Sequence, residues 1–149
     1  MAKTQAEKAA AFEALHKAPG VFVIPNPWDP GSARVLAGLG FKALTTTSAG
    51  YARSIGFPDY NAGRENVMAH IRAMAPMIDV PLAADLEDGF GPRPEDCAET
   101  IRQGAEAGLV GGSIEDFTGD RSDPIHSIAK AAERIRAAAE AARKLPFKF

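Results

Sequence analysis

Carboxylates dominate one stretch of the sequence. Ten acidic residues lie between positions 85 and 120, and only two arginines oppose them. Asp85 and Glu87 follow one short apolar run and Glu115 follows the next, so all three are expected at the ends of strands. Carboxylates that converge in this way repel one another and raise each other's pKa unless a cation joins them.

A hard divalent cation is the natural partner for this group, because only oxygen ligands are available. Mg²⁺ (or Mn²⁺) is the candidate, since Mg²⁺ takes one or two carboxylates directly and keeps several waters. The alternative is that these acids are solvated loop residues or favourable charges at helix N-termini. The pattern alone leaves both interpretations open.

A turn rich in hydroxyl groups, Thr45 to Ser48, follows another apolar run. Hydroxyl and backbone N–H groups in such a turn are suited to grip a carboxylate or a phosphate. A β-branched strand end followed by a turn has the same composition, so this is an alternative interpretation. Trp28 follows the first apolar run of the chain and either lines a ligand pocket or packs beneath a loop.

Other reactive side chains are expected to be structural. Cys97, the single cysteine, excludes an internal disulfide and lies on the apolar side of an expected helix, which favours a buried packing thiol. His16, His70 and His126 all lie in or beside expected helices, and a surface position is predicted for each. The glycines form no dinucleotide-binding fingerprint.

The candidate residues are positioned by an alternation of short apolar runs and amphipathic stretches. Strands are expected at 21–24, 41–46, 80–84 and 109–114, and helices at 4–17, 29–40, 67–75, 94–107 and 125–142. This alternation predicts an α/β fold of about four parallel β/α units after an N-terminal helix. In such a sheet the carboxyl ends of the strands meet at one rim, where ligands bind.

Composition limits the classes of protein that the chain can belong to. It has 149 residues, 46% of them hydrophobic, and a net charge of −2. This apolar content is too high for a disordered chain, and no apolar run reaches the ~18 residues of a membrane span. The near-neutral charge argues against a nucleic-acid surface. The N-terminus has no apolar signal core, so a cytoplasmic location is expected.

Five motifs become recognisable when they are taken in order. They are Val23–Arg34, Thr47–Gly50, Ile55–Asp59, Asp85–Gly91 and Ser113–Asp116. Together they resemble the isocitrate lyase/phosphoenolpyruvate mutase superfamily, from about residue 12 to the C-terminus. The chain is most similar to the branch with carboxyvinyl-carboxyphosphonate phosphorylmutase-like and oxaloacetate decarboxylase-like proteins.

The resemblance implies a (β/α)₈ barrel that binds Mg²⁺ and a small 2-oxo or 2-hydroxy carboxylate. Members make or break a C–C or P–C bond beside the carboxylate through an enolate, and they are commonly homo-oligomers. By resemblance, Asp85 and Glu87 belong to the metal site, with Asp85 as the direct ligand. Asp59 and Glu115 are the implied catalytic residues and, like Glu87, hold metal-bound waters. The implied substrate-binding residues are Trp28, Thr46, Thr47 and Ser48.

Two departures from the family pattern matter. Isocitrate and methylisocitrate lyases carry a Lys-Cys-Gly-His loop after the fourth strand, whereas residues 117–122 here contain neither Cys nor His. This argues against both activities. A (β/α)₈ barrel also typically needs about 250 residues, so residues 1–149 are expected to form a single partial barrel that ends at the start of the fifth strand. The alternative to an enzyme is therefore a catalytically inactive half-barrel that binds metal or self-associates.

Overall fold

A parallel three-stranded sheet organises the chain, of which the computed structural model describes residues 2–149. The strands are β1 (Leu44–Thr45), β2 (Leu82–Asp85) and β3 (Gly111–Ser113), in the order β1-β2-β3. Leu44 pairs with Leu82, and Asp85 pairs with Ser113. All three strands therefore end at the same rim, as the alternation of elements predicts.

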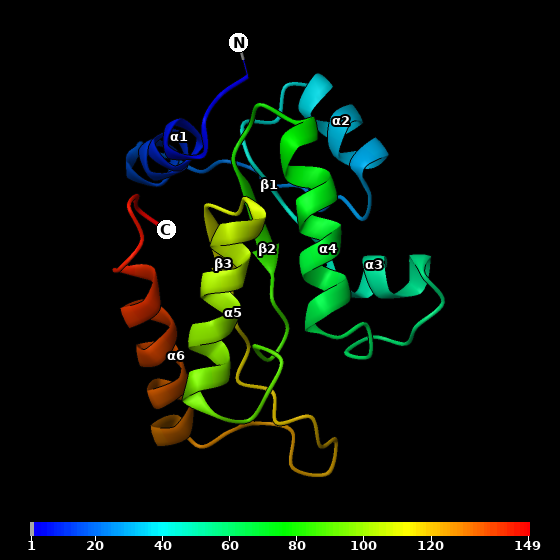
Figure 1. The fold of residues 1–149 in the computed structure, drawn as a ribbon, viewed down its shortest axis with the longest axis vertical. Helices are drawn as coiled ribbons and strands as arrows, with labels where there is room; N and C mark the ends of the chain where they lie inside the picture. The colour runs from blue at the N-terminus through cyan, green and yellow to red at the C-terminus, as the bar shows by residue number, and fades with distance from the viewer. Residues whose placement is uncertain (1) are drawn as a thin grey trace.

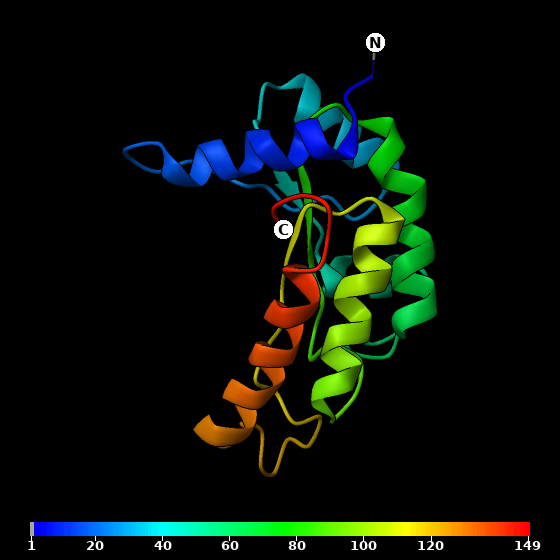
Figure 2. The same cartoon turned by 60° about the vertical axis from the view of Figure 1, so that its left-hand side comes forward.

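Helices cover the sheet and one of its ends. They are α1 (Gln5–Lys17), α2 (Pro30–Gly38), α3 (Ser48–Ser54), α4 (Arg64–Met74), the 3₁₀ helix η1 (Ala75–Met77), α5 (Pro94–Ala107) and α6 (Ile128–Ala142). Figure 1 shows α4, α5 and α6 side by side along the sheet. Figure 2 shows α1 lying across the end where the strands begin. The rim with the candidate site residues is at the opposite end.

Local signals in the sequence fix most of these boundaries. Thr4 caps α1 in a reciprocal capping box with Glu7, and Asp29 caps α2 by accepting the Ser32 N–H at 2.6 Å. Gly108 ends α5 with a left-handed φ of 111°. The expected helix at 94–107 is confirmed at both ends. The short helix α3 carries no periodic apolar stripe, and the sequence did not predict it.

The strand expected at 21–24 is wrong. Val21 is 100% exposed and Val23 is 67% exposed, although a strand buried on both faces was expected. The chain does run beside β1 a few residues later, where the Pro25 carbonyl accepts the Thr45 N–H at 3.2 Å. A regular parallel bridge also needs the N–H of residue 27, which is a proline and has none. The side chain of Asn26 donates to the Thr45 carbonyl instead, at 3.1 Å.

The helix expected at 125–142 is confirmed from Ile128 to Ala142, but its buried face differs in part from the expected apolar stripe. The expected stripe comprised Ile125, Ile128, Ala132, Ile135, Ala139 and Ala142. In the structure, Ile128 is 91% exposed, and the residues of α6 that are buried are Arg134, Ala138 and Ala141. The small alanines allow close packing against α5, whereas Ile135 lines a shallow hollow of about 180 Å³ beside β3.

His70 is buried, which corrects the expectation of a surface position. Its ring stacks on Tyr51 with the centroids 3.9 Å apart, and its Nε2 atom has no hydrogen-bond partner. Tyr51 belongs to α3, the helix that the sequence did not predict, so its packing against α4 could not be anticipated. Burial lowers the pKa of His70, and the nearby Asp29 carboxylate partly offsets this.

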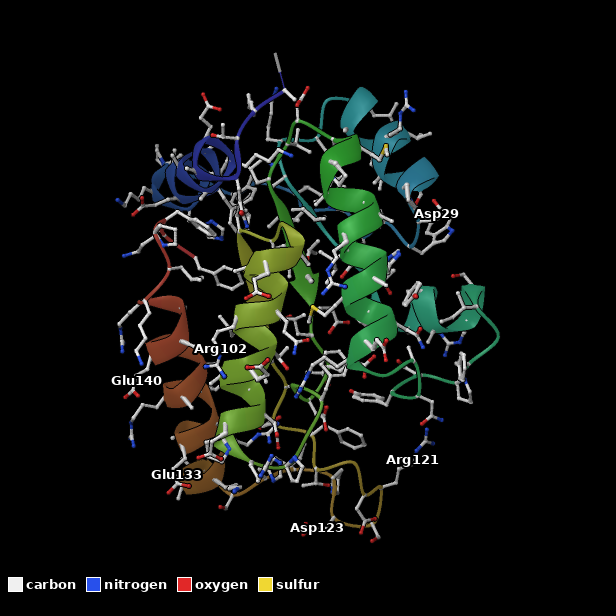
Figure 3. The ribbon with its side chains drawn as sticks, in the orientation of Figure 1. Asp29, Arg102, Arg121, Asp123, Glu133 and Glu140 are labelled. Carbon is white, nitrogen blue, oxygen red and sulfur yellow. The ribbon has the colours of Figure 1, made fainter. Side chains whose placement is uncertain are left out.

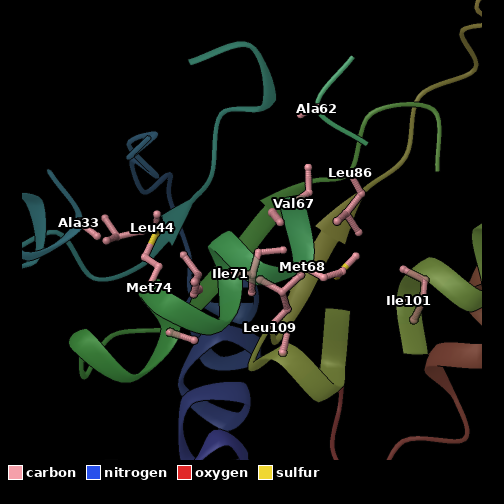
Figure 4. Close-up of a cluster of buried hydrophobic side chains, with 14 of the residues drawn as sticks. Ala33, Leu44, Ala62, Val67, Met68, Ile71, Met74, Leu86, Ile101 and Leu109 are labelled. Atoms are coloured by element: carbon pink, nitrogen blue, oxygen red, sulfur yellow. The ribbon is translucent and has the colours of Figure 1, made fainter. Parts of the chain in front are cut away.

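The hydrophobic core lies between the sheet and the helices that cover it. Figure 4 shows Met68, Ile71 and Met74 of α4 directed toward side chains from β1 and from the segments next to β2 and β3. Cys97 is fully buried in the same core, as expected for a packing thiol, and burial raises the pKa of the thiol. Among residues 2–149, no helix is both long and apolar enough to cross a bilayer.

Candidate active site

Asp85, the last residue of β2, is held at both carboxylate oxygens. Ser48 donates to Oδ2 from its hydroxyl at 2.6 Å and from its backbone N–H at 3.3 Å. The backbone N–H of Glu87 donates to Oδ1 at 3.1 Å. Asp85 is half-buried at the rim, and these donors fix the orientation of its carboxylate.

Glu87 is a buried carboxylate without a full set of partners. Glu87 is only 2% exposed, and its Oε1 atom accepts no hydrogen bond. The backbone is left-handed here, with φ at 49°, which is uncommon for a residue with a side chain. Burial is the largest cause of a raised pKa at Glu87, and the charges of Asp88, Asp85, Asp59 and Glu115 add to it, so that the pKa reaches about 7.

Glu115 follows β3 and joins the same cluster. Its backbone N–H donates to the Glu87 carbonyl at 2.8 Å, and its Oε2 atom accepts a hydrogen bond from the Tyr60 hydroxyl. The Tyr60 ring lies 4.7 Å from that of Phe117. Burial raises the pKa of Tyr60, and the hydrogen bond to Glu115 raises it further, so the hydroxyl keeps its proton. Sequence reasoning missed Tyr60, because no spacing or periodicity marks it.

Asp59 precedes Tyr60 in the loop between α3 and α4. It is half-buried, and its Oδ1 atom accepts the backbone N–H of Tyr60 at 3.1 Å. Because Tyr60 donates both to Asp59 and to Glu115, it links Asp59 to the other carboxylates, and the charge of Asp59 also contributes to the raised pKa of Glu87. Four acidic residues expected from the sequence therefore lie around one part of the rim: Asp59, Asp85, Glu87 and Glu115.

Residues 46–48 of the hydroxyl-rich turn form hydrogen bonds within the protein. The Thr46 N–H donates to the Ala83 carbonyl at 3.2 Å, which joins the turn to β2. The Thr47 hydroxyl accepts the Gly50 N–H at 3.1 Å and so caps α3. Ser48 is committed to Asp85, as described above. Trp28 is half-exposed beside this turn. It lies close to Gly50, since a Cβ atom added to Gly50 would be 3.3 Å from the Cβ of Trp28.

The donor set suits a hard cation that keeps most of its waters. Within residues 2–149, no three His, Cys, Asp or Glu side chains converge closely enough to hold a metal by themselves. A site with one direct carboxylate and several waters does not need such a set. Glu87 Oε1 is buried and lacks a donor, and a cation-bound water or the cation would satisfy it. The residues present therefore fit Mg²⁺ or Mn²⁺ held largely through water.

The loop that follows β3, residues 117–125, is closed by its own hydrogen bonds. Phe117 and Ile125 form an isolated antiparallel bridge, and the Thr118 N–H donates to the Pro124 carbonyl at 2.9 Å. Figure 3 shows Arg121 and Asp123 at the tip of this loop. It carries neither the cysteine nor the histidine of the lyase motif.

The fold and the acidic rim define an α/β protein with the architecture of a partial TIM barrel. The sequence model of the phosphoenolpyruvate phosphomutase family matches residues 12–149. The chain belongs to this family, within the isocitrate lyase/phosphoenolpyruvate mutase superfamily.

Curated relatives agree with this placement. An uncharacterized protein of Mycobacterium tuberculosis is 36% identical over 122 residues, which cover 80% of this chain and 46% of that protein. The 2-methylisocitrate lyase of Escherichia coli is 31% identical over 110 residues, covering 68% of this chain and 37% of the lyase. The chain spans about half the length of the curated relatives that it matches, or less.

Solved structures show the same relation. A candidate lyase/mutase from Burkholderia cenocepacia J2315 is 56% identical with a TM-score of 0.95, covering 97% of this chain and 52% of that one. A phosphonopyruvate hydrolase, solved with oxalate and Mg²⁺, is 24% identical with a TM-score of 0.84 and shares the fold. It matches 90% of this chain and 48% of its own.

Proposed function

We propose that the site is that of a Mg²⁺-dependent lyase or mutase acting on a small 2-oxo or 2-hydroxy acid. The reaction makes or breaks a C–C or P–C bond beside the substrate carboxylate and passes through an enolate. The observation that carries this proposal is the oriented Asp85 beside the buried, partner-poor carboxylate of Glu87. Membership of a family of lyases and mutases supports it.

In the proposed site, Asp85 is the direct ligand of the cation. Asp59, Glu87 and Glu115 hold its waters in this proposal. Glu87 is joined to Asp85 through its N–H, Glu115 to Glu87 through its own N–H, and Tyr60 links Asp59 to Glu115. When bound, the cation supplies Lewis-acid stabilisation to the negative charge that develops on the enolate oxygen. That charge is largest in the transition state, so a preorganised site accelerates the chemical step.

The hydroxyl turn and Trp28 form the proposed substrate side of the site. Ser48 places its hydroxyl and N–H on Asp85, and Thr46 and Thr47 precede it in the same turn. Trp28 offers a half-exposed indole next to this turn. Because Thr47 and Ser48 already use their hydroxyls within the protein, their part in binding falls to orienting the turn. We do not extend the proposal to methylisocitrate cleavage, because residues 117–122 lack the thiol of that motif.

The proposal is tested by calorimetric titration with Mg²⁺ and by an oxaloacetate decarboxylation assay. Asp85→Ala is expected to weaken Mg²⁺ binding by more than about 100-fold, because it removes the direct ligand. Glu140→Ala is the control, since Glu140 lies on the exposed side of α6 (Figure 3). Unchanged Mg²⁺ affinity in Asp85→Ala would remove Asp85 from the ligand role.

A second candidate is that residues 1–149 form a partial barrel that binds the cation but does not turn substrate over. The extent of the match favours it, because the chain covers only 52% of the lyase/mutase structure from Burkholderia cenocepacia that it resembles. The assay therefore compares this chain with one extended through the remaining strands of the barrel. Equal turnover by both forms would exclude the inactive half-barrel, whereas turnover by the extended form alone would support it.

A further inference from the structure

The loop between β2 and α5 has an unusual backbone. Glu87 and Phe90 adopt left-handed φ values of 49° and 58°, and Gly89 adopts 79°. Residues with a side chain rarely adopt this conformation, and it persists only where the surroundings impose it. Since Glu87 is the buried acid of the candidate site, whatever imposes this conformation also places that carboxylate.

A buried arginine from the far end of the sequence holds this loop. Arg134 of α6 is 1% exposed, and its Nη1 donates to the Gly91 carbonyl at 2.6 Å. Its Nη2 donates to the carbonyl of Asp88. The guanidinium thus spans the loop from one side to the other, over a separation of more than 40 residues in sequence.

The charge of Arg134 is not neutralised by a direct ion pair. The salt bridges found in residues 2–149 are those of Lys17–Glu13, Arg93–Asp96 and Arg102–Glu99. A buried guanidinium that binds carbonyl dipoles instead of a carboxylate is costly, and its Nε atom has no partner at all. Packing alone does not require such a residue, because an apolar side chain would fill the same space without that cost.

The loop is also anchored from its other side. Arg64 of α4 donates from Nη2 to the carbonyls of Gly89 at 3.3 Å and Phe90 at 3.1 Å, and Thr100 donates to the Gly89 carbonyl at 2.8 Å. Every peptide carbonyl from 88 to 91 therefore accepts a side-chain hydrogen bond. Arg134 is the member of this set that comes from α6.

The held loop is continuous with the acidic cluster. Asp88, whose carbonyl Arg134 binds, follows Glu87 directly. Glu87 in turn donates its N–H to Asp85 and accepts the N–H of Glu115. A shift of the Asp88 peptide would therefore move the backbone groups that join three of the four carboxylates.

We infer that Arg134 is a positioning residue for the cation site and acts through the carbonyls of Asp88 and Gly91. The inference rests on the proposed function, in which Asp85 and Glu87 belong to that site. The planar fork of a guanidinium holds two carbonyls at once, which a lysine ammonium does not do with the same geometry. Arg134 thereby couples α6 to the site. The other buried residues that the structure describes on α6 are alanines, which form no side-chain hydrogen bonds.

The chain offers a matched control in Lys8. This residue of α1 is also buried and also holds two backbone carbonyls, those of Ala75 at 3.0 Å and Ile78 at 2.6 Å. Both carbonyls precede β2, so Lys8 acts at the opposite end of the sheet from Arg134. Lys8→Met therefore removes a comparable buried cation without touching the rim.

The experiment compares wild type, Arg134→Met, Arg134→Lys and Lys8→Met by Mn²⁺ titration and amide hydrogen exchange, with urea unfolding as the stability reference. Arg134→Met is expected to weaken Mn²⁺ binding at least tenfold and to speed exchange of the Gly89 and Glu115 amides. Arg134→Lys is expected to fall between it and wild type. Lys8→Met is expected to lower stability but to leave Mn²⁺ affinity and these two amides unchanged.

The outcomes separate the positioning role of Arg134 from a general loss of stability and from failure of the proposed function. If wild type binds Mn²⁺ and Arg134→Met binds it within twofold, with unchanged exchange, the positioning role is wrong. If Lys8→Met weakens Mn²⁺ binding as much as Arg134→Met, the effect is one of stability and the inference is also wrong. If wild type does not bind Mn²⁺, the proposed function fails, and the exchange of Gly89 and Glu115 still decides whether Arg134 holds the loop. If Arg134→Met does not fold, Arg134→Lys carries the same comparison.

Discussion

At the scale of single residues, the site depends on how Asp85 is held before any ligand arrives. Donors from α3 and from the β2–α5 loop fix both of its oxygens. Such partners orient a metal ligand, and their removal typically weakens metal binding 10- to 100-fold, roughly speaking. Ser48 is the partner whose side chain can be removed without disturbing the backbone.

Ser48→Ala is therefore expected to weaken Mg²⁺ binding by about tenfold, because Asp85 loses its 2.6 Å hydrogen bond. The free energy of unfolding should fall by about 1.5–3 kcal/mol, the range for a hydrogen bond to a charged group. Ser54→Ala is the control: it lies on the same helix and donates to the Tyr51 carbonyl at 2.7 Å, away from the site. Calorimetry and urea unfolding measure both quantities, and equal Mg²⁺ affinity in the two variants would contradict the prediction.

His70 gives the protein a pH-dependent stability. Its pKa is lowered in the folded state, so the unfolded chain binds the proton more tightly. The free energy of unfolding contributed by His70 is present above the unfolded pKa of about 6.5 and decreases as the pH falls from there toward the folded pKa. Glu87 acts in the opposite direction, because its raised pKa of about 7 favours proton binding by the folded protein.

The difference between wild type and His70→Phe isolates this contribution. Phe keeps the stacking on Tyr51 but does not titrate. The stability of wild type relative to His70→Phe is expected to decrease between pH 7.5 and pH 5.5, as measured by urea unfolding at each pH. His126→Gln serves as the control outside the buried core, and a pH-independent difference for His70→Phe would refute the prediction.

The acidic residues of the site could be predicted from the sequence, but their setting could not. Asp85, Glu87 and Glu115 are recognisable because each follows an apolar run. Tyr60 and Arg134 are not, because their partners are backbone or side-chain atoms more than 40 residues away. Only the three-dimensional arrangement brings such groups together.

At the scale of elements, the segment before α2 shows where sequence patterns fail. The apolar run 21–24 has the composition of a buried strand, but the contact with β1 is made later, by Pro25 and Pro27. Both proline carbonyls accept N–H groups, from Thr45 at 3.2 Å and Thr47 at 3.3 Å. By contrast, helices with a cap at each end, such as 94–107, are predicted to the residue because their signals are local.

Asn26 is expected to stabilise this contact, since its amide takes the place of the missing N–H of Pro27. Asn26→Ala should lower the free energy of unfolding by about 1 kcal/mol, which is typical for one hydrogen bond. It should also speed hydrogen exchange of the Thr45 and Thr47 amides, whose acceptors lie on the same segment. Asn61→Ala, in the exposed loop before α4, is the control. Unchanged exchange at Thr45 and Thr47 would show that the Asn26 amide is dispensable.

At the scale of the whole molecule, the chain leaves apolar side chains uncovered on two sides. Val21 is fully exposed in the segment between α1 and α2, and Ile128 is exposed at the start of α6. The family's solved structures are about twice as long as this chain, which matches 52% of one of them. An open parallel sheet with uncovered margins is prone to pair with another chain.

This chain by itself is therefore expected to self-associate. Analytical ultracentrifugation should show a mass that rises with protein concentration, since burial of apolar area drives the contact. Val21→Lys combined with Val23→Lys should shift the population to the monomer, because the charges replace exposed apolar side chains whose burial would drive the contact. Leu39→Lys is the control, as Leu39 is an apolar side chain 72% exposed at the end of α2, outside the segment 21–23. A wild-type chain that stays monomeric at all concentrations, or a double variant that associates as wild type does, would show that the segment at Val21 and Val23 is not an association surface.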